Sequence, residues 1–75
     1  MGAFDSNIIL PVFELTEKHK ETWRNNPESV WLAGLIEEVA ELAQSIGGKH
    51  EHTPEQELRQ IAAIALNWLD MRTNG

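Results

Sequence analysis

Apolar residues recur every three to four positions in three separate segments of this chain, which is the spacing of one face of an α-helix. The first segment runs from about Pro11 to Arg24. Its stripe consists of Val12, Leu15, His19 and Trp23. Because proline has no N–H, Pro11 suits the first turn of a helix, and we expect residues 1–10 to form an irregular arm.

The second segment runs from about Pro27 to Ile46 and meets two glycines, Gly47 and Gly48, that predict a C-cap. Asn26 is a favourable N-cap residue ahead of a proline at the first helical position. One broad apolar face of this helix contains Trp31, Leu32, Leu35, Ile36, Val39, Leu42, Ala43 and Ile46. We expect this face to pack into the core.

A capping box, Thr53-Pro54-Glu55-Gln56, opens the third segment, which continues to about Arg72. Its predicted core face consists of Leu58, Ile61, Ala62, Ala65, Trp68 and Leu69. A second stripe along one border of that face contains Glu57, Gln60, Ile64, Asn67 and Met71. The sequence has no strand pattern and no internal repeat, so it predicts an all-α fold of three helices in a single domain, residues 1–75.

The size of the chain predicts association. Seventy-five residues enclose a small core, and there is no cysteine to form a disulfide. Apolar positions cover more than one side of the third helix, and three helices cannot cover them all. We therefore expect a helical bundle formed by homo-oligomerisation, as a homodimer or a homotetramer.

The charge balance narrows the class of partner. Twelve acidic residues against six Lys and Arg give a formal net charge of −6, which disfavours a nucleic-acid surface. The chain has neither a signal-peptide pattern nor an apolar run long enough to span a bilayer. We expect a cytoplasmic protein that binds neither nucleic acid nor membrane.

Four glutamates carry the candidate chemistry. Glu37, Glu38 and Glu41 share one helical segment, and Glu57 opens the next. Like charges three or four residues apart on a helix repel by roughly 0.2–0.5 kcal/mol per pair. Carboxylates gathered from two facing helices are suited to Mg²⁺, so we expect Glu38, Glu41 and Glu57 to bind this ion. The alternative is a solvated acidic face.

The run L-I-E-E-V-A-E-L-A, a short loop, and then E-L-R-Q-I-A-A-I-A-L-N-W-L-D resembles the MazG-like, all-α nucleoside triphosphate pyrophosphohydrolases, and phage-type members in particular. That family carries E-E-x-x-E on one helix and E-x-x-D on the next. The first motif matches Glu37, Glu38 and Glu41, and the first residue of the second motif matches Glu57. Asn67 matches an Asn often found ten residues later.

The resemblance implies hydrolysis of a nucleoside triphosphate, an NTP or a dNTP, to the monophosphate and pyrophosphate, with Mg²⁺, or Mn²⁺ in its place, as cofactor. It also implies roles for the matching residues. Glu38, Glu41 and Glu57 would be metal ligands, Glu37 would orient a ligand or help to activate water, and Asn67 would contact the nucleotide or a metal-binding carboxylate. Gln60 stands where the family has Asp, so it would be a weak or water-mediated ligand.

Four other features have both a functional and a structural interpretation. His19 could recognise a base or be a hydrogen-bonded core residue, and the three tryptophans fit the core better than a stacking site. Lys49 and Arg59 could counter phosphate charge or be ordinary surface cations. His50 and His52 have the spacing of two metal ligands, but structural zinc needs four ligands and the loop offers no further ones at a supporting spacing.

Two alternatives to the enzyme remain open at this point. One is a non-catalytic helical interaction module of the same fold, with a metal site weakened by Gln60. The other is an acidic helical adaptor unrelated to nucleotides. The recurrence of glutamates on two helices in register with Asn67 favours the enzyme over the adaptor, but it does not separate the enzyme from the module.

Overall fold

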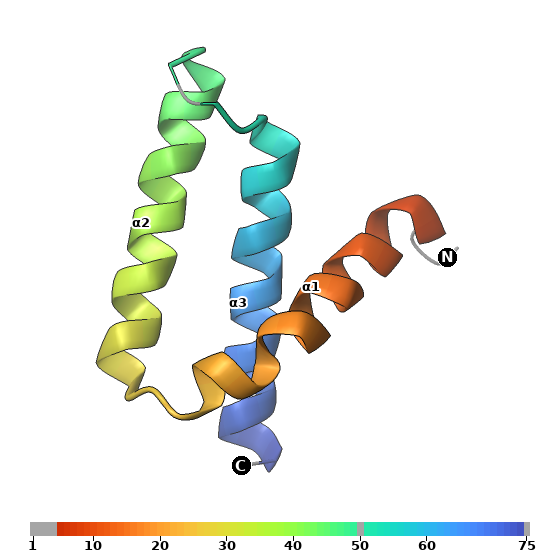
Figure 1. Ribbon diagram of the computed structural model, residues 1–75, viewed down its shortest axis with the longest axis vertical. Helices are drawn as coiled ribbons and strands as arrows, with labels where there is room; N and C mark the ends of the chain where they lie inside the picture. The colour runs from red at the N-terminus through yellow and green to blue at the C-terminus, as the bar shows by residue number, and fades with distance from the viewer. Residues whose placement is uncertain (1–4, 50, 75) are drawn as a thin grey trace.

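Three helices account for the fold of the part of the chain that the structure, a computed structural model, describes: residues 5–49 and 51–74. They are α1 (Ser6–Arg24), α2 (Glu28–Ile46) and α3 (Pro54–Asn74), and no strand occurs in this part. The helices α2 and α3 form an antiparallel hairpin, and α1 crosses α3 obliquely (Figure 1). The predicted all-α, three-helix chain is confirmed. None of the described helices is long and apolar enough to cross a membrane.

Helix α1 begins five residues earlier than the sequence predicted. The Asp5 side chain caps it by accepting a hydrogen bond from the backbone N–H of Asn7 at 2.8 Å. Pro11 therefore lies inside the helix, where its missing N–H leaves the carbonyl of Asn7 without its usual intrahelical donor. The predicted irregular arm is wrong for residues 6–10: the helix begins at the Asp5 cap and continues through Pro11 with one backbone hydrogen bond missing; residues 1–4 lie outside the described part.

Helix α2 has a different N-cap from the one predicted. Pro27, not Asn26, occupies the cap position, and it offers no side-chain hydrogen bond. The Asn26 side chain instead donates to the carbonyl of Thr22 at 3.3 Å, and the Asn26 carbonyl accepts the indole N–H of Trp31 at 3.1 Å. Asn26 thus joins the end of α1 to the core rather than capping α2.

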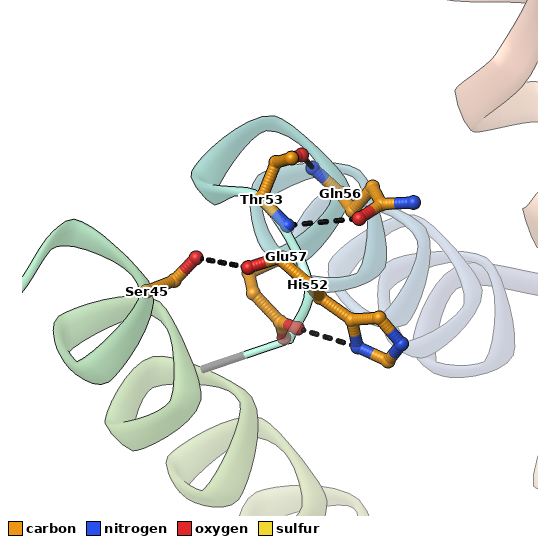
Figure 2. A network of polar contacts seen from close by, with 5 residues as sticks. All are labelled: Ser45, His52, Thr53, Gln56 and Glu57. Atoms are coloured by element: carbon orange, nitrogen blue, oxygen red, sulfur yellow. Dashed lines mark hydrogen bonds and ion pairs between the residues drawn. The ribbon is translucent and has the colours of Figure 1, made fainter. Parts of the chain in front are cut away.

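The other predicted helix ends are confirmed. Gly48 has a φ of 73°, which favours glycine, and the N–H of Lys49 donates to the carbonyl of Gln44 at 2.9 Å, closing α2 in a Schellman-type turn. At the start of α3, the N–H of Thr53 donates to Gln56 Oε1 at 2.8 Å, and the N–H of Gln56 donates to Thr53 Oγ1 at 3.2 Å (Figure 2). This is the capping box that the sequence predicted.

Tryptophans form the centre of the core. The Trp31 ring is 1% exposed and lies between Trp23 and Trp68, with ring centroids 5.3 Å and 6.1 Å away. Tilted aromatic pairs at such distances contribute about 0.5–1.5 kcal/mol each beyond their buried area. The buried apolar side chains of the described part are Val12, Trp31, Ala63 and Ile64. The core interpretation of the tryptophans is therefore favoured for Trp31.

At the open end of the hairpin, beside the tryptophans, a salt bridge and a hydrogen bond from an indole N–H join α2 to α3. The Glu28 carboxylate accepts from the Trp68 indole N–H at 2.6 Å and from Arg72 Nε at 2.6 Å. These two donors lower the pKa of Glu28. The first turn of α2 is thereby tied to the last turns of α3.

The predicted core face of α2 is wrong in its orientation. Ile36 is 60% exposed and Ile46 is 71% exposed, and Leu32 and Val39 are exposed as well. The face of α2 with the least exposure consists of Trp31, Gly34, Leu35, Glu38, Glu41, Leu42 and Ser45. The apolar arc is wider than the area that a single neighbouring helix covers, and the hairpin covers the edge of it that includes Trp31.

The same rotation occurs on α3. Leu58 and Leu69, from the predicted core face, are more than half exposed, and Ala65 is exposed. The predicted border stripe is the one that packs: Glu57, Ile64 and Asn67 are buried, and Gln60 and Met71 are half-buried. Polar and acidic side chains therefore face inward, while an apolar strip of each hairpin helix faces outward.

Gly34 allows the close contact between α1 and α2, and its substitution gives a first prediction. A methyl group at this position would overlap the indole of Trp23, which packs on Trp31. Although Gly→Ala inside a helix normally stabilises by up to about 1 kcal/mol, we expect Gly34→Ala to destabilise by about 1–3 kcal/mol. Urea unfolding monitored by circular dichroism measures this change.

A second background makes the test specific. In Trp23→Leu protein the overlap is absent, so Gly34→Ala should stabilise the fold there. If Gly34→Ala has the same sign in both backgrounds, the proposed contact is wrong.

Candidate functional site

Three carboxylates converge between α2 and α3. Glu38 and Glu41, three residues apart, face α3, and Glu57 faces α2 from the first turn of α3. One oxygen from each of the three lies within 4.8 Å of the others. The Glu57 side chain is 1% exposed, and Glu38 and Glu41 are half-buried. We name this group the glutamate cluster.

The carboxylates of the cluster repel one another, and this repulsion changes the pKa of Glu38. Burial, a hydrogen bond with Glu57 and the charges of Glu41 and Glu57 raise the pKa of Glu38 from 4.5 to about 8. At neutral pH and without a cation, Glu38 therefore keeps a proton that an exposed glutamate would have lost. A divalent cation bound by the same oxygens would satisfy them in place of that proton.

The loop before α3 fixes the position of Glu57 (Figure 2). Ser45 Oγ, in the last turn of α2, donates to the carbonyl of His52 at 2.6 Å. The Nδ1 atom of His52 lies 3.1 Å from Glu57 Oε1. A hydrogen bond of this kind restricts the rotamer of a carboxylate and so favours metal binding by it.

Neither Ser45 nor His52 was predicted to act in this way. The sequence suggested His52 as half of a metal pair with His50, which lies outside the described residues. A histidine directly before the N-cap Thr53 could have indicated the contact, because a helix start places it within reach of the first turn. The buried serine gave no such signal.

Two cavities lie beside the cluster and share Gln60. The smaller, of about 190 Å³, is lined by His19, Trp23, Glu38, Gln60, Ala63, Ile64 and Asn67. The larger, of about 420 Å³, is lined by Pro11, Glu14, Leu15, Lys18, His52, Gln56, Glu57, Arg59 and Gln60. Each cavity thus reaches one member of the glutamate cluster, Glu38 in the first and Glu57 in the second.

The structure brings most of the other predicted site residues to these cavities. His19 lines the smaller one, as does Asn67, whose Nδ2 donates to the carbonyl of Thr16 at 3.1 Å and so ties α3 to α1. Glu37 is exposed on α2 and is not one of the three clustered carboxylates. Lys49 is exposed after α2 and lines neither cavity.

The raised pKa of Glu38 gives a second prediction. The folded protein holds a proton on Glu38 that the unfolded chain releases above pH 4.5, so the free energy of unfolding should fall as the pH rises from 4.5 to about 8. Thermal unfolding without divalent cation at pH 5.5, 6.5, 7.5 and 8.5 measures the loss. Glu38→Gln, which keeps the side chain neutral, should have a smaller slope and a higher Tm at pH 8.5 than the wild type. Equal slopes for the two proteins would show that Glu38 ionises normally.

Comparison of the chain with protein-family models, with curated proteins and with solved structures found no match. Its function must therefore be inferred from the glutamate cluster, the cavities beside it and the motif that carries them.

Proposed function

We propose that this protein is a Mg²⁺-dependent nucleoside triphosphate pyrophosphohydrolase of the MazG-like kind. The observation that carries the proposal is the convergence of Glu38, Glu41 and Glu57 from two helices. These are the residues that the motif resemblance assigns to the metal. A solvated acidic face, the alternative from sequence, would not bury Glu57 or raise the pKa of Glu38.

The donor set fits the ion. Mg²⁺ prefers a few carboxylate oxygens and completes its shell with water and substrate phosphates, and the cluster offers three carboxylates beside two cavities. When bound, Mg²⁺ would polarise a phosphoryl oxygen and lower the pKa of a water molecule. Mn²⁺ has similar ligand preferences and could replace it.

The protein's own side chains would position the substrate and accept a proton. The oxygen of water would bond to the α-phosphorus, the bond from this phosphorus to the bridging oxygen would break, and pyrophosphate would leave with that oxygen. A carboxylate of the site would accept the proton of the water. Glu37 would orient a ligand or assist this water from the exposed side of the same turn.

The smaller cavity would hold the base. His19 and Trp23 offer it a polar edge and an aromatic surface. Asn67 would contact it through its side-chain oxygen or its second N–H, because one N–H donates to the carbonyl of Thr16. Lys49 remains a candidate for phosphate contact from the loop after α2.

Gln60 supports a second candidate, the non-catalytic module. It lies one turn after Glu57 and lines both cavities, and it offers a carbonyl oxygen but no negative charge. A site with one charge fewer would bind the metal more weakly. The fold would serve equally well as a helical interaction surface.

Pyrophosphate release separates the two candidates. We expect the wild type, with Mg²⁺ and a panel of NTPs and dNTPs, to release pyrophosphate, and Glu41→Gln to lose activity by about a hundredfold or more. Gln60→Asp should tighten Mg²⁺ binding and raise the rate, because it restores the missing charge. Gln44→Asp, on the exposed side of α2, is the matched control and should change neither.

Three proteins that are all inert would favour the module. An efficient wild type with no gain in Gln60→Asp would show that the missing charge is harmless.

The exposed apolar strips support the proposed homo-oligomer. On each helix of the hairpin, the strip is rotated by about 100° about the helix axis from the side that faces the other helix. The two rotations have the same sense along the chain. Because the helices are antiparallel, both strips therefore lie on the same side of the hairpin. Helix α1 bonds to Asn67 on the opposite flank of α3, and its residues Ile8 and Val12 lie beside Leu58 where the strip begins. The strips are Leu32, Ile36, Val39, Ala43 and Ile46 of α2 and Leu58, Ala65 and Leu69 of α3.

We propose a second copy of the chain as the partner of this face. The eight exposed residues form an apolar face, which suits an apolar partner face, and two-fold symmetry lets such a patch cover itself. Two hairpins packed in this way form a four-helix arrangement, as a homodimer or as half of a homotetramer. The glutamate cluster would remain accessible from the α1 side of each copy.

Sedimentation at low micromolar concentration measures the association. We expect the wild type to be dimeric or tetrameric and Ile36→Glu to be monomeric or unfolded, because a charge would be placed in an apolar interface. Gln44→Glu adds the same charge to α2 outside the strip and should leave the oligomer intact. A well-folded wild-type monomer would contradict the proposal.

A further inference from the structure

Two cations line the larger cavity from different helices. Lys18 comes from α1 and Arg59 from α3, so the fold joins residues that are far apart in sequence. Within residues 5–49 and 51–74, neither of them has an ion-pair partner. Lys20, by contrast, lies 3.8 Å from Asp70. In a chain with net charge −6, unpaired cations directed at a shared cavity indicate an anionic ligand.

The cavity borders the glutamate cluster at Glu57. Glu57 and Gln60 form part of its wall, and Gln60 also borders the smaller cavity. A ligand lying across Gln60 would therefore reach both cavities and pass the carboxylates between them. The larger volume, about 420 Å³, is within the range of small-molecule sites.

We propose that the larger cavity binds the terminal pyrophosphate portion of the substrate, with Lys18 and Arg59 as its protein contacts. The inference rests on the proposed function and adds the direction in which the substrate lies. The base occupies the cavity of His19 and Trp23, the α-phosphate lies beside the glutamate cluster, and the β- and γ-phosphates extend between α1 and the start of α3.

Charge explains why such contacts are needed. The glutamate cluster repels a polyphosphate, and the metal offsets this repulsion only near the carboxylates. An arginine fork and a lysine ammonium are the usual phosphate donors, and they would hold the leaving pyrophosphate away from the acidic side chains. Glu14 lines the same cavity and opposes the anion, so its removal should have the opposite effect.

Binding of inorganic pyrophosphate tests the assignment. Titration calorimetry with pyrophosphate in the presence of Mg²⁺ should show a Kd about tenfold higher for Lys18→Gln, and likewise for Arg59→Gln, than for the wild type, since loss of one charge-assisted contact is commonly of that size. Glu14→Gln should lower the Kd. Lys20→Gln is the matched control and should leave it unchanged. Circular dichroism checks that each variant is folded.

Hydrolysis measured on the same proteins separates the assignment of the pyrophosphate cavity from the proposed hydrolase activity. An active wild type whose pyrophosphate affinity is the same in all variants would overturn the cavity assignment and leave the proposed function intact. An inert wild type whose pyrophosphate binding still depends on Lys18 and Arg59 would support the anion site and overturn the hydrolase. Absence of both hydrolysis and pyrophosphate binding would overturn both.

Discussion

Repulsion among three clustered carboxylates, one buried and two half-buried, is the constraint on which the rest of this structure depends. The α2–α3 interface is aromatic at one end, around Trp31, and acidic at the other, around Glu57. A domain of this size has a free energy of unfolding of roughly 5–15 kcal/mol at most, so repulsion within a cluster of like charges removes a substantial part of it. The raised pKa of Glu38 shows one way of reducing the repulsion, by retaining a proton; a divalent cation would be another.

The inward position of the acids determines the outward position of the apolar strips. Each hairpin helix has a wide apolar arc, and the hairpin turns the edge that carries glutamate inward on both. At the other end of the interface, Trp31 of α2 packs on Trp68 of α3, and Gly34 leaves room for the indole of Trp23 from α1 beside them. A fold selected for burial alone would place Ile36 and Leu69 inside. Their exposure is consistent with a site on one side of the hairpin and an association surface on the other.

Local signals in the sequence predicted the helices well. Caps made by neighbouring residues, such as the Thr53 and Gln56 box or the glycines after α2, depend on a few positions and were found as expected. Which face of each helix packs was not predictable in the same way, because it depends on where the other helices lie. The start of α1 was missed for a related reason: a proline preference was weighed without the Asp5 cap that overrides it.

In the candidate site, too, local motifs were predictable from the sequence and tertiary contacts were not. The convergence of Glu38, Glu41 and Glu57 follows from two motifs on an antiparallel hairpin, and the sequence predicted it. The contact of His52 with Glu57 and the joint placement of Lys18 and Arg59 arise from tertiary structure, which spacing along the chain does not encode.

Direct titration with Mg²⁺ or Mn²⁺ tests the central claim, that the glutamate cluster exists to bind a divalent cation. Calorimetry on the wild type and on Glu41→Gln should give a saturable heat for the first and a much weaker one for the second, because one of three carboxylate ligands is removed. Equal and negligible heats for the two proteins would contradict the account.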